Sequence, residues 1–241
     1  MATGLARGWG EPVLVCDALP DRAESLAADA GGEPLASNAE VAERADVVVL
    51  CHKPHQLAEV AEQVGGRARA VVSILAGTTT AQVEAAYPGV PVYRFIPNLP
   101  VQVRRGVLCY AAGSLAGEGP EREVLELFGR VGIVLPLSEP LIDPAMGVMS
   151  CGPAFVALMV ESLAQAGQAH GIDPEDAELM ALETFAGTTA LLSELGIAPA
   201  ELRERVATPG GTTEKGLIAL EQGGLRSTIA AAVDAAVEAA R

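Results

Sequence analysis

Aromatic side chains and positive charge are both scarce in this sequence. Phe, Trp and Tyr make up 3% of the 241 residues, and 16 basic residues stand against 31 acidic ones, which gives a formal net charge of -15 at pH 7. With so few aromatic residues, a β-sandwich stabilised by aromatic cross-strand pairs is not expected. The acidic excess works against sequence-independent attraction to phosphates, so we expect no nucleic acid partner.

Cysteine is sparse as well, and its spacing argues against disulfides and metal sites. No CxxC pair occurs, which favours buried, reduced thiols. Cys51, His52 and His55 place three possible ligands close together, but no further ligand cluster accompanies them, so we expect no metal. The four cysteines are Cys16, Cys51, Cys109 and Cys151.

Signals for export or membrane insertion are also missing. We recognise no signal peptide and no apolar stretch long enough to span a membrane, which predicts a cytoplasmic protein without a membrane partner. The hydrophobic content of 50% and the mean hydropathy of +0.31 are nevertheless ample for a packed core.

The first part of the chain, from Pro12 to about Pro136, alternates short apolar runs with helix-like segments. Continuous rather than alternating hydrophobicity, with helices between the runs, is typical of a largely parallel sheet that is buried on both faces. This part is therefore predicted to be α/β. The predicted strands are 13–16, 47–50, 70–74, 92–95, 107–110 and 132–135.

After Asp143 the strand signals stop and helical stretches follow. Pro174 and Pro199 each stand where a first helical turn accepts proline, and Gly171 and Gly196 stand where a preceding helix would end. The predicted helices are 144–170, 174–195, 199–206, 213–222 and 225–240. We therefore expect two domains, residues 1–142 and residues 143–241.

The glycine turn of a dinucleotide-binding domain is not found in this chain. In such a domain the first strand and its GxGxxG turn deliver the pyrophosphate to the first helix, but residues 1–10 themselves are predicted to be that helix. We therefore expect a gap in the sheet beside the strand at Val13, as if the sequence began just after the glycines.

Other cofactor positions are recognisable. Asp17 follows a strand, where a carboxylate could accept a ribose hydroxyl, although a helix-cap or turn role is equally compatible. The run Leu50–Pro54 ends another strand, at the edge where open α/β sheets bind ligands, but Lys53 could equally be a solvated loop residue.

A turn near the end of the chain is suited to a small carboxylate. The segment 208–213 reads Thr-Pro-Gly-Gly-Thr-Thr and leads directly into a helical pattern. Free backbone N–H groups and hydroxyls at a helix N-terminus form a site for an anion. An ordinary interhelical loop with a threonine cap is the alternative.

These segments together resemble the pyrroline-5-carboxylate reductase family. The resemblance covers nearly the whole chain, and five matching segments in the family's order are hard to reach by chance. Cys151, Phe155 and Thr208 depart from the small residue, the tyrosine and the serine that are usual in the family. The segments are Leu50–Pro54 (AVKP), Ser73–Gly77 (SxxAG), Arg94–Pro100 (RxMPNxP), Ser150–Phe155 (SGSGPAY) and Thr208–Glu221 (the C-terminal signature).

The resemblance implies a fold, a reaction and a set of site residues. The fold would be a Rossmann-like N-terminal domain with its first strand missing, followed by an all-α domain that binds substrate and forms a homodimer, with rings of dimers as a further option. The reaction would be reduction of L-1-pyrroline-5-carboxylate to L-proline by NADPH or NADH, the last step of proline biosynthesis. The chain would be an NAD(P)H-dependent oxidoreductase that acts on a C=N bond.

Site residues follow from the resemblance position by position. Thr213 would hydrogen-bond the ring nitrogen as the catalytic residue, and its hydroxyl could orient the iminium and assist proton movement. The substrate would contact Thr208, Gly210, Gly211, Thr212 and Thr213, and the cofactor would contact Asp17, Asn38, Cys51, His52, Lys53, Pro54, Ala76, Gly77 and Asn98.

Two alternatives remain open on the sequence. The first is a reductase of another small cyclic imine or keto acid on the same scaffold. The second is a catalytically empty helical dimer that keeps the fold but cannot hold the dinucleotide, because the glycine turn is not found in this chain.

Overall fold

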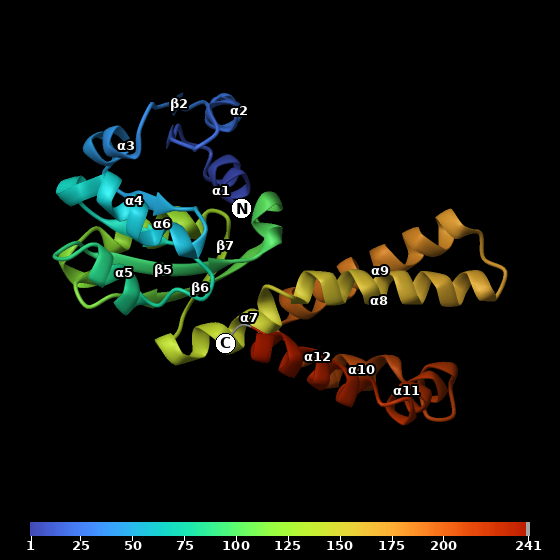
Figure 1. Ribbon diagram of the computed structural model, residues 1–241. Coiled ribbons are helices and arrows are strands. Elements are labelled where there is room, and N and C mark those ends of the chain that lie inside the picture. The colour runs from blue at the N-terminus through green and yellow to red at the C-terminus, as the bar shows by residue number, and fades with distance from the viewer. Residues whose placement is uncertain (240–241) are drawn as a thin grey trace. The chain divides into compact units, whose positions relative to one another are not determined.

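The structure is a computed structural model that describes residues 1–239 (Figure 1). Contacts between residues divide the chain into two compact units. The first unit is Met1–Ser150, to which the end of the last helix from Val237 is also assigned, and the second is Cys151–Ala236.

The first unit is built on a five-stranded sheet in the order β3-β4-β5-β6-β7. The pairs β3–β4, β4–β5 and β6–β7 are parallel, and β5–β6 is antiparallel, so the sheet is largely parallel as the sequence predicts. The strands are β3 Val48–Leu50, β4 Val71–Ser73, β5 Val92–Pro97, β6 Gly106–Ala112 and β7 Gly132–Pro136.

Helices connect these strands and cover the sheet. The α-helices are α1 Ala2–Trp9, α2 Pro20–Ala30, α3 Asn38–Arg44, α4 Leu57–Val64, α5 Thr80–Ala86, α6 Glu121–Gly129 and α7 Ile142–Met149. Short 3₁₀ helices are η1 Pro54–Gln56, η2 Gly65–Arg67, η3 Leu99–Val103, η4 Ala116–Glu118 and η5 Glu139–Leu141.

The period of two along β5 sends its side chains to two different cores. Tyr93 and Phe95 join the cluster that α1 and α6 cover, where Phe95 stacks on Phe128 with ring centroids 4.1 Å apart. Val92 and Ile96 face the other side, where Val92 packs with residues of α3, α4 and α5, and Ile96 with residues of α7. Both faces of the sheet are thus covered, which explains the continuous apolar runs.

A gap in the sheet appears beside Val13, as expected. The strand β1 Leu14–Val15 pairs in parallel only with β2 Glu33–Pro34, and these two strands form a sheet of their own within the described residues. The edge of β3 that faces away from β4 therefore has no strand partner in the part of the chain that the structure describes. Neither β2 residue is apolar enough to have been recognised as a strand from sequence.

The second unit is all-α, again as predicted. Its helices are α8 Gly152–Ala169, α9 Pro174–Leu195, α10 Pro199–Val206, α11 Thr212–Gln222 and α12 Leu225–Ala239. The predicted helix 144–170 is interrupted at Ser150–Cys151, between α7 and α8. Residue 240, the predicted end of the last helix, lies outside the described residues.

The expectation that the sequence has no apolar stretch long enough to span a membrane is wrong. The helical stretch Glu139–Ala169 is long and apolar enough, by length and composition, to cross a membrane, with a mean hydropathy of 1.5 over its best window. The stretch escaped notice because Glu139, Asp143 and Glu161 interrupt its apolar residues at wide intervals. Only 11% of that window is buried within the single chain.

Candidate active site

The carboxyl ends of β3 and β4 lie at the same end of the sheet because the two strands are parallel. The chain leaves β3 through Cys51–Lys53 and leaves β4 through the turn Leu75–Thr79. An open hollow of about 550 Å³ lies beside these segments and is lined on one side by Pro54 and His55 and on the other by Gly77, Thr78 and Gln82. Two of the predicted cofactor residues, Pro54 and Gly77, thus border one hollow.

The loop after β3 is fixed by its own hydrogen bonds. The Lys53 N–H donates to Gln56 Oε1 at 3.0 Å, and His52 Nδ1 lies 2.9 Å from the Lys53 carbonyl oxygen. Because a carbonyl only accepts, Nδ1 of His52 carries the proton in this contact. The other ring nitrogen, Nε2, is buried and has no partner among the described residues.

The Cys51 thiol is not set up as a nucleophile. Although the residue as a whole is exposed, desolvation by the protein atoms around its sulfur raises the pKa of Cys51 to about 12, and the Met1 amino group opposes this rise. The thiol therefore stays protonated at neutral pH.

The turn after β4 leaves its backbone accessible. Gly77 adopts the left-handed conformation with φ of 68°, and no atom lies within 4 Å of the place that a Cβ atom would occupy. An open glycine turn and an unpartnered imidazole nitrogen at the carboxyl end of a parallel sheet fit a nicotinamide dinucleotide. Ala76, the neighbouring predicted residue, is exposed on the same turn.

Asp17 and Asn38 lie earlier in the chain than β3 and have protein partners. Asp17 Oδ1 accepts a hydrogen bond from the Leu19 N–H at 2.9 Å, so the turn role is present in this structure. Asn38 is the first residue of α3, and its Nδ2 donates to Gln63 Oε1 at 2.6 Å. The predicted contacts of both residues with the adenosine part of a cofactor stay predictions.

Asn98 is engaged within the protein. Its side chain is 6% exposed, its Nδ2 donates to the Met149 carbonyl oxygen at 2.9 Å, and its Oδ1 accepts from the Val107 N–H at 2.9 Å. These bonds hold the end of β5 to β6 and to the end of α7. A further contact of Asn98 with a cofactor stays a prediction.

The turn at 208–213, predicted to bind a carboxylate, has the backbone form that the sequence suggests. Gly210 has φ of 74°, the Gly211 N–H donates to the Thr208 carbonyl oxygen at 2.9 Å, and α11 begins at Thr212 without a side-chain cap. Thr212 and Thr213 thus form the first turn of α11, where backbone N–H groups have no helical acceptor.

Sequence reasoning missed one group at this turn. The Glu214 side chain reaches back, and its Oε2 accepts a hydrogen bond from the Gly210 N–H at 2.7 Å. The Gly210 donor is therefore occupied in this structure. The spacing of Gly210 and Glu214, one helical turn apart, is the signal that could have indicated this contact.

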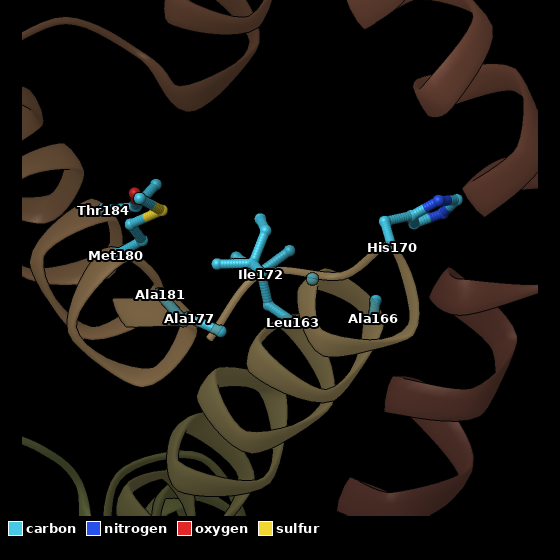
Figure 2. Close-up of a pocket in the computed structure, with 9 residues that line it drawn as sticks. Leu163, Ala166, His170, Ile172, Ala177, Met180, Ala181 and Thr184 are labelled. Atoms are coloured by element: carbon cyan, nitrogen blue, oxygen red, sulfur yellow. The ribbon is translucent and has the colours of Figure 1, made fainter. Parts of the chain in front are cut away.

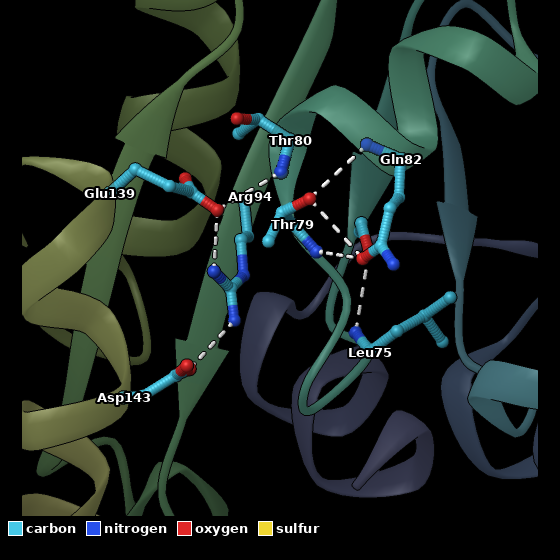
Figure 3. A network of polar contacts seen from close by, with 8 residues as sticks. Leu75, Thr79, Thr80, Gln82, Arg94, Glu139 and Asp143 are labelled. Atoms are coloured by element: carbon cyan, nitrogen blue, oxygen red, sulfur yellow. Dashed lines mark hydrogen bonds and ion pairs between the residues drawn. The ribbon is translucent and has the colours of Figure 1, made fainter. Parts of the chain in front are cut away.

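A buried ion cluster also went unpredicted. Arg94 on β5 is 1% exposed, and its guanidinium contacts Glu139 Oε1 at 2.6 Å and Asp143 Oδ1 at 3.2 Å. Figure 3 shows Glu139 between Arg94 and the backbone N–H of Thr80, which donates to the same oxygen at 3.0 Å. The partners lie too far from Arg94 in sequence for any local pattern to reveal them.

A second hollow, of about 370 Å³, lies between α8 and α9. Figure 2 shows Ile172 at its centre, with His170 on one side and Met180 and Thr184 on the other. Its lining is mainly apolar, so it offers few groups for chemistry. Within residues 1–239, no three His, Cys, Asp or Glu side chains gather closely enough to bind a metal.

Comparison with known proteins points to one family. The family model described as pyrroline-5-carboxylate reductase dimerisation matches residues 139–241, and the one described as NADP oxidoreductase coenzyme F420-dependent matches residues 1–77. Pyrroline-5-carboxylate reductase of Synechocystis sp. is 37% identical over 83% of this chain and 75% of its own length. That of Mycobacterium tuberculosis is 34% identical over 100% of this chain and 90% of its own length.

Solved structures give the same result. A pyrroline-5-carboxylate reductase from Coxiella burnetii has a TM-score of 0.91 at 29% identity, covering 99% of this chain and 93% of that one. The α/β unit with its open strand ends, the helical unit after it and the two family matches define a nicotinamide-dependent oxidoreductase. The chain belongs to the pyrroline-5-carboxylate reductase family.

Proposed function

We propose that this protein reduces L-1-pyrroline-5-carboxylate to L-proline with a reduced nicotinamide dinucleotide. The observation that carries the proposal is the identity of 34% to the Mycobacterium tuberculosis reductase across the whole chain, joined to the open N-terminus of α11 at Thr212. The first unit would hold the cofactor and the second would hold the substrate. The finer division at residues 142 and 143 stays a prediction.

The substrate carboxylate would bind at the start of α11. The free backbone N–H groups of Thr212 and Thr213 and the Thr208 hydroxyl would hold it, with Gly211 shaping the turn, because a helix N-terminus carries partial positive charge. Glu214 would have to stay turned toward Gly210, since its carboxylate would otherwise repel the substrate's. Holding the carboxylate fixes the position of the imine carbon.

Thr213 would contact the imine nitrogen of the substrate. The bound cofactor supplies the hydride that reduces the C=N bond. The Thr213 hydroxyl would hydrogen-bond the ring nitrogen, orient the iminium and assist proton movement as that nitrogen becomes a basic amine. No strong acid is needed, because the iminium already carries its proton.

The cofactor would lie along the segments at the carboxyl ends of β3 and β4. Ala76 and Gly77 would approach it with their backbone, and Cys51 to Pro54 would line it from the neighbouring strand. One family model matching residues 1–77 is described as an NADP oxidoreductase, which supports NADPH. Asp17 disfavours a 2′-phosphate whereas Arg22 could hold one, so both NADPH and NADH are candidates.

A second candidate function has one observation in its favour. The β1–β2 pair stands apart from the main sheet, beside the place where a dinucleotide-binding fold carries its first strand and glycine turn. A homodimer that keeps the fold without binding the dinucleotide would share that gap. The homodimer itself follows from the family match, and rings of dimers and a cytoplasmic location stay predictions.

The deciding experiment measures oxidation of NADPH and of NADH with pyrroline-5-carboxylate, and with a second cyclic imine and a keto acid as controls. Turnover with pyrroline-5-carboxylate alone supports the proposal. Faster turnover of the second cyclic imine or of the keto acid would mean that the protein is a reductase of a different substrate. A folded dimer that neither binds nor oxidises either dinucleotide supports the non-catalytic candidate.

A further inference from the structure

The buried ion cluster lies where two apolar clusters meet. Arg94 shares its face of β5 with Val92 and Ile96, which pack against helices on either side of it, α5 and α7. A charge that is 1% exposed needs partners to offset its desolvation. Those partners come from η5, which supplies Glu139, and from α7, which supplies Asp143.

Glu139 does more than balance the charge of Arg94. Its Oε1 accepts hydrogen bonds from Arg94 Nη1 at 2.6 Å and from the Thr80 N–H at 3.0 Å. Thr80 is the first residue of α5, so its N–H has no acceptor inside the helix. One carboxylate oxygen thus ties the beginning of α5 to the buried arginine, as Figure 3 shows.

The start of α5 is also the end of the turn Leu75–Thr79. The Thr79 N–H donates to Gln82 Oε1 at 2.8 Å, and Thr79 Oγ1 accepts from the Gln82 N–H at 3.2 Å, which forms a capping box. At the other end of the turn, Ser73 Oγ lies 3.3 Å from the Leu75 nitrogen. Between these anchors, Ala76 and Gly77 are exposed, so their position depends on the anchors.

We infer that Arg94 and Glu139 act as positioning residues for the cofactor, because together they fix the turn Leu75–Thr79 through the Thr80 N–H. We call this set of Arg94, Glu139 and Thr80 the Glu139 clamp. Neither charged residue lines the hollow beside Gly77. The inference rests on the proposed function, in which Ala76 and Gly77 contact the nicotinamide dinucleotide.

Asp143 provides a matched control. Like Glu139, it accepts a hydrogen bond from the Arg94 guanidinium through one carboxylate oxygen, but no hydrogen bond joins it to α5 or to the turn among the described residues. E139A and D143A each remove one carboxylate from Arg94, whereas only E139A removes the acceptor of the Thr80 N–H. E139Q keeps an amide oxygen that can accept both bonds.

The test compares the three variants with the wild-type protein by two measurements. Binding of NADPH is followed by its fluorescence, and exchange of the Thr80 amide is followed by NMR in the protein without cofactor. In E139A we expect a Kd for NADPH about tenfold higher and faster exchange at Thr80, because a backbone donor loses its partner. D143A should match the wild type in both measurements. E139Q should bind NADPH nearly as tightly as the wild type and show nearly the same exchange at Thr80.

Two results would overturn the inference. One is a Thr80 amide that exchanges no faster in E139A than in the wild type. The other is a D143A variant that weakens NADPH binding as much as E139A does, since the effect would then come from the buried charge and not from the turn. A wild-type protein that binds neither NADPH nor NADH contradicts the proposed function instead, and the exchange at Thr80 still decides whether the clamp holds the turn.

Discussion

Arg94 is the residue whose replacement we expect to lower the free energy of unfolding most. Its guanidinium is 1% exposed, while the side chains of its partners Glu139 and Asp143 are 29% and 37% exposed. R94M would leave both carboxylates beside an apolar core without their cation. Breaking a buried pair from one side typically costs about 3 to 5 kcal/mol, and we expect a loss of that order in the free energy of unfolding.

Urea denaturation of R94M and R69M checks this expectation. Arg69 pairs with Asp46 on the surface, where the two side chains are 66% and 87% exposed, so losing that pair should cost less than about 1 kcal/mol. Equal losses in the two variants would contradict the assigned role. They would mean that Glu139 and Asp143 rehydrate freely once the arginine is gone.

Tyr87 gives a second prediction at this scale. Its ring is 2% exposed, and its hydroxyl is buried without a partner among the described residues. Replacing such a group by an apolar one of the same shape is neutral or stabilising. We expect Y87F to be as stable as the wild type at neutral pH, or more stable by up to about 1 to 3 kcal/mol.

The pH dependence of Tyr87 has a definite sign. Burial raises the pKa of Tyr87 to about 12 in the folded protein, above the value of about 10 for an exposed tyrosine. Below pH ~10 the folded and the unfolded protein both keep the Tyr87 proton, so the full free energy of unfolding is present. Between about pH 10 and 12 only the unfolded chain releases the proton, and the free energy of unfolding falls. Thermal melts across this range should show a smaller loss for Y87F, and parallel curves would contradict the role of Tyr87.

Residue-level features of the site were only partly predictable. The turn at 208–213 could be predicted from its own residues, because Pro209 and two adjacent glycines are typical of turns. The partners of Arg94 lie 45 and 49 residues along the chain, and only folding brings them together. The contact of Glu214 with Gly210 spans only four residues, and it was missed because a threonine cap was the expected feature there.

At the scale of elements, most strands and helices follow from sequence patterns. The six apolar runs all contain strands, and the predicted helices 174–195 and 199–206 match α9 and α10. Prolines at the first turns of these helices fixed their beginnings. The strand β2 escaped because Glu33 and Pro34 are exposed and carry no hydrophobic signal.

The beginning of α11 allows a matched pair of glycine substitutions. At Gly211 a Cβ atom would overlap with Thr208 Oγ1 and lie 3.0 Å from the Thr208 carbonyl oxygen, whereas at Gly216 no atom lies within 4 Å. G211A should therefore displace Thr208 and raise the KM for pyrroline-5-carboxylate about tenfold or more, because the proposed binding site for the substrate carboxylate loses its geometry. G216A should leave KM unchanged and stabilise the helix by up to about 1 kcal/mol.

Steady-state kinetics and thermal melts on both variants test this pair. A KM that rises equally in G211A and G216A would show that any added methyl group disturbs α11. An unchanged KM in both variants would place the substrate carboxylate elsewhere. The KM for NADPH serves as an internal reference, since neither glycine belongs to the predicted cofactor positions.

At the scale of the whole molecule, the two units differ in how they bury apolar surface. The first unit has three buried clusters that include β5, Phe128 and Ile142, so its sheet is covered on both faces. The second unit has one small cluster, of Ala164, Ala177 and Ala181. A single chain thus accounts for the core of the first unit but hardly for that of the second.

The exposed apolar residues of the second unit predict a concentration-dependent stability. Leu158, Leu179 and Met180 are 61%, 58% and 57% exposed in the single chain, and the matching family model over residues 139–241 is described as a dimerisation domain. If a second copy covers these residues, folding is linked to association, and Tm rises with protein concentration by mass action.

Melts recorded over a roughly hundredfold range of concentration test this linkage, since that range adds about 2.7 kcal/mol to the stability of a dimer. We expect the transition of the second unit to move upward by several degrees and L179E to abolish the movement, because a buried, unpaired carboxylate opposes association. E178Q, which changes the neighbouring residue without adding charge, should behave like the wild type. A Tm that is independent of concentration, with a monomeric mass in sedimentation, would mean that the apolar faces of α8 and α9 remain uncovered in solution.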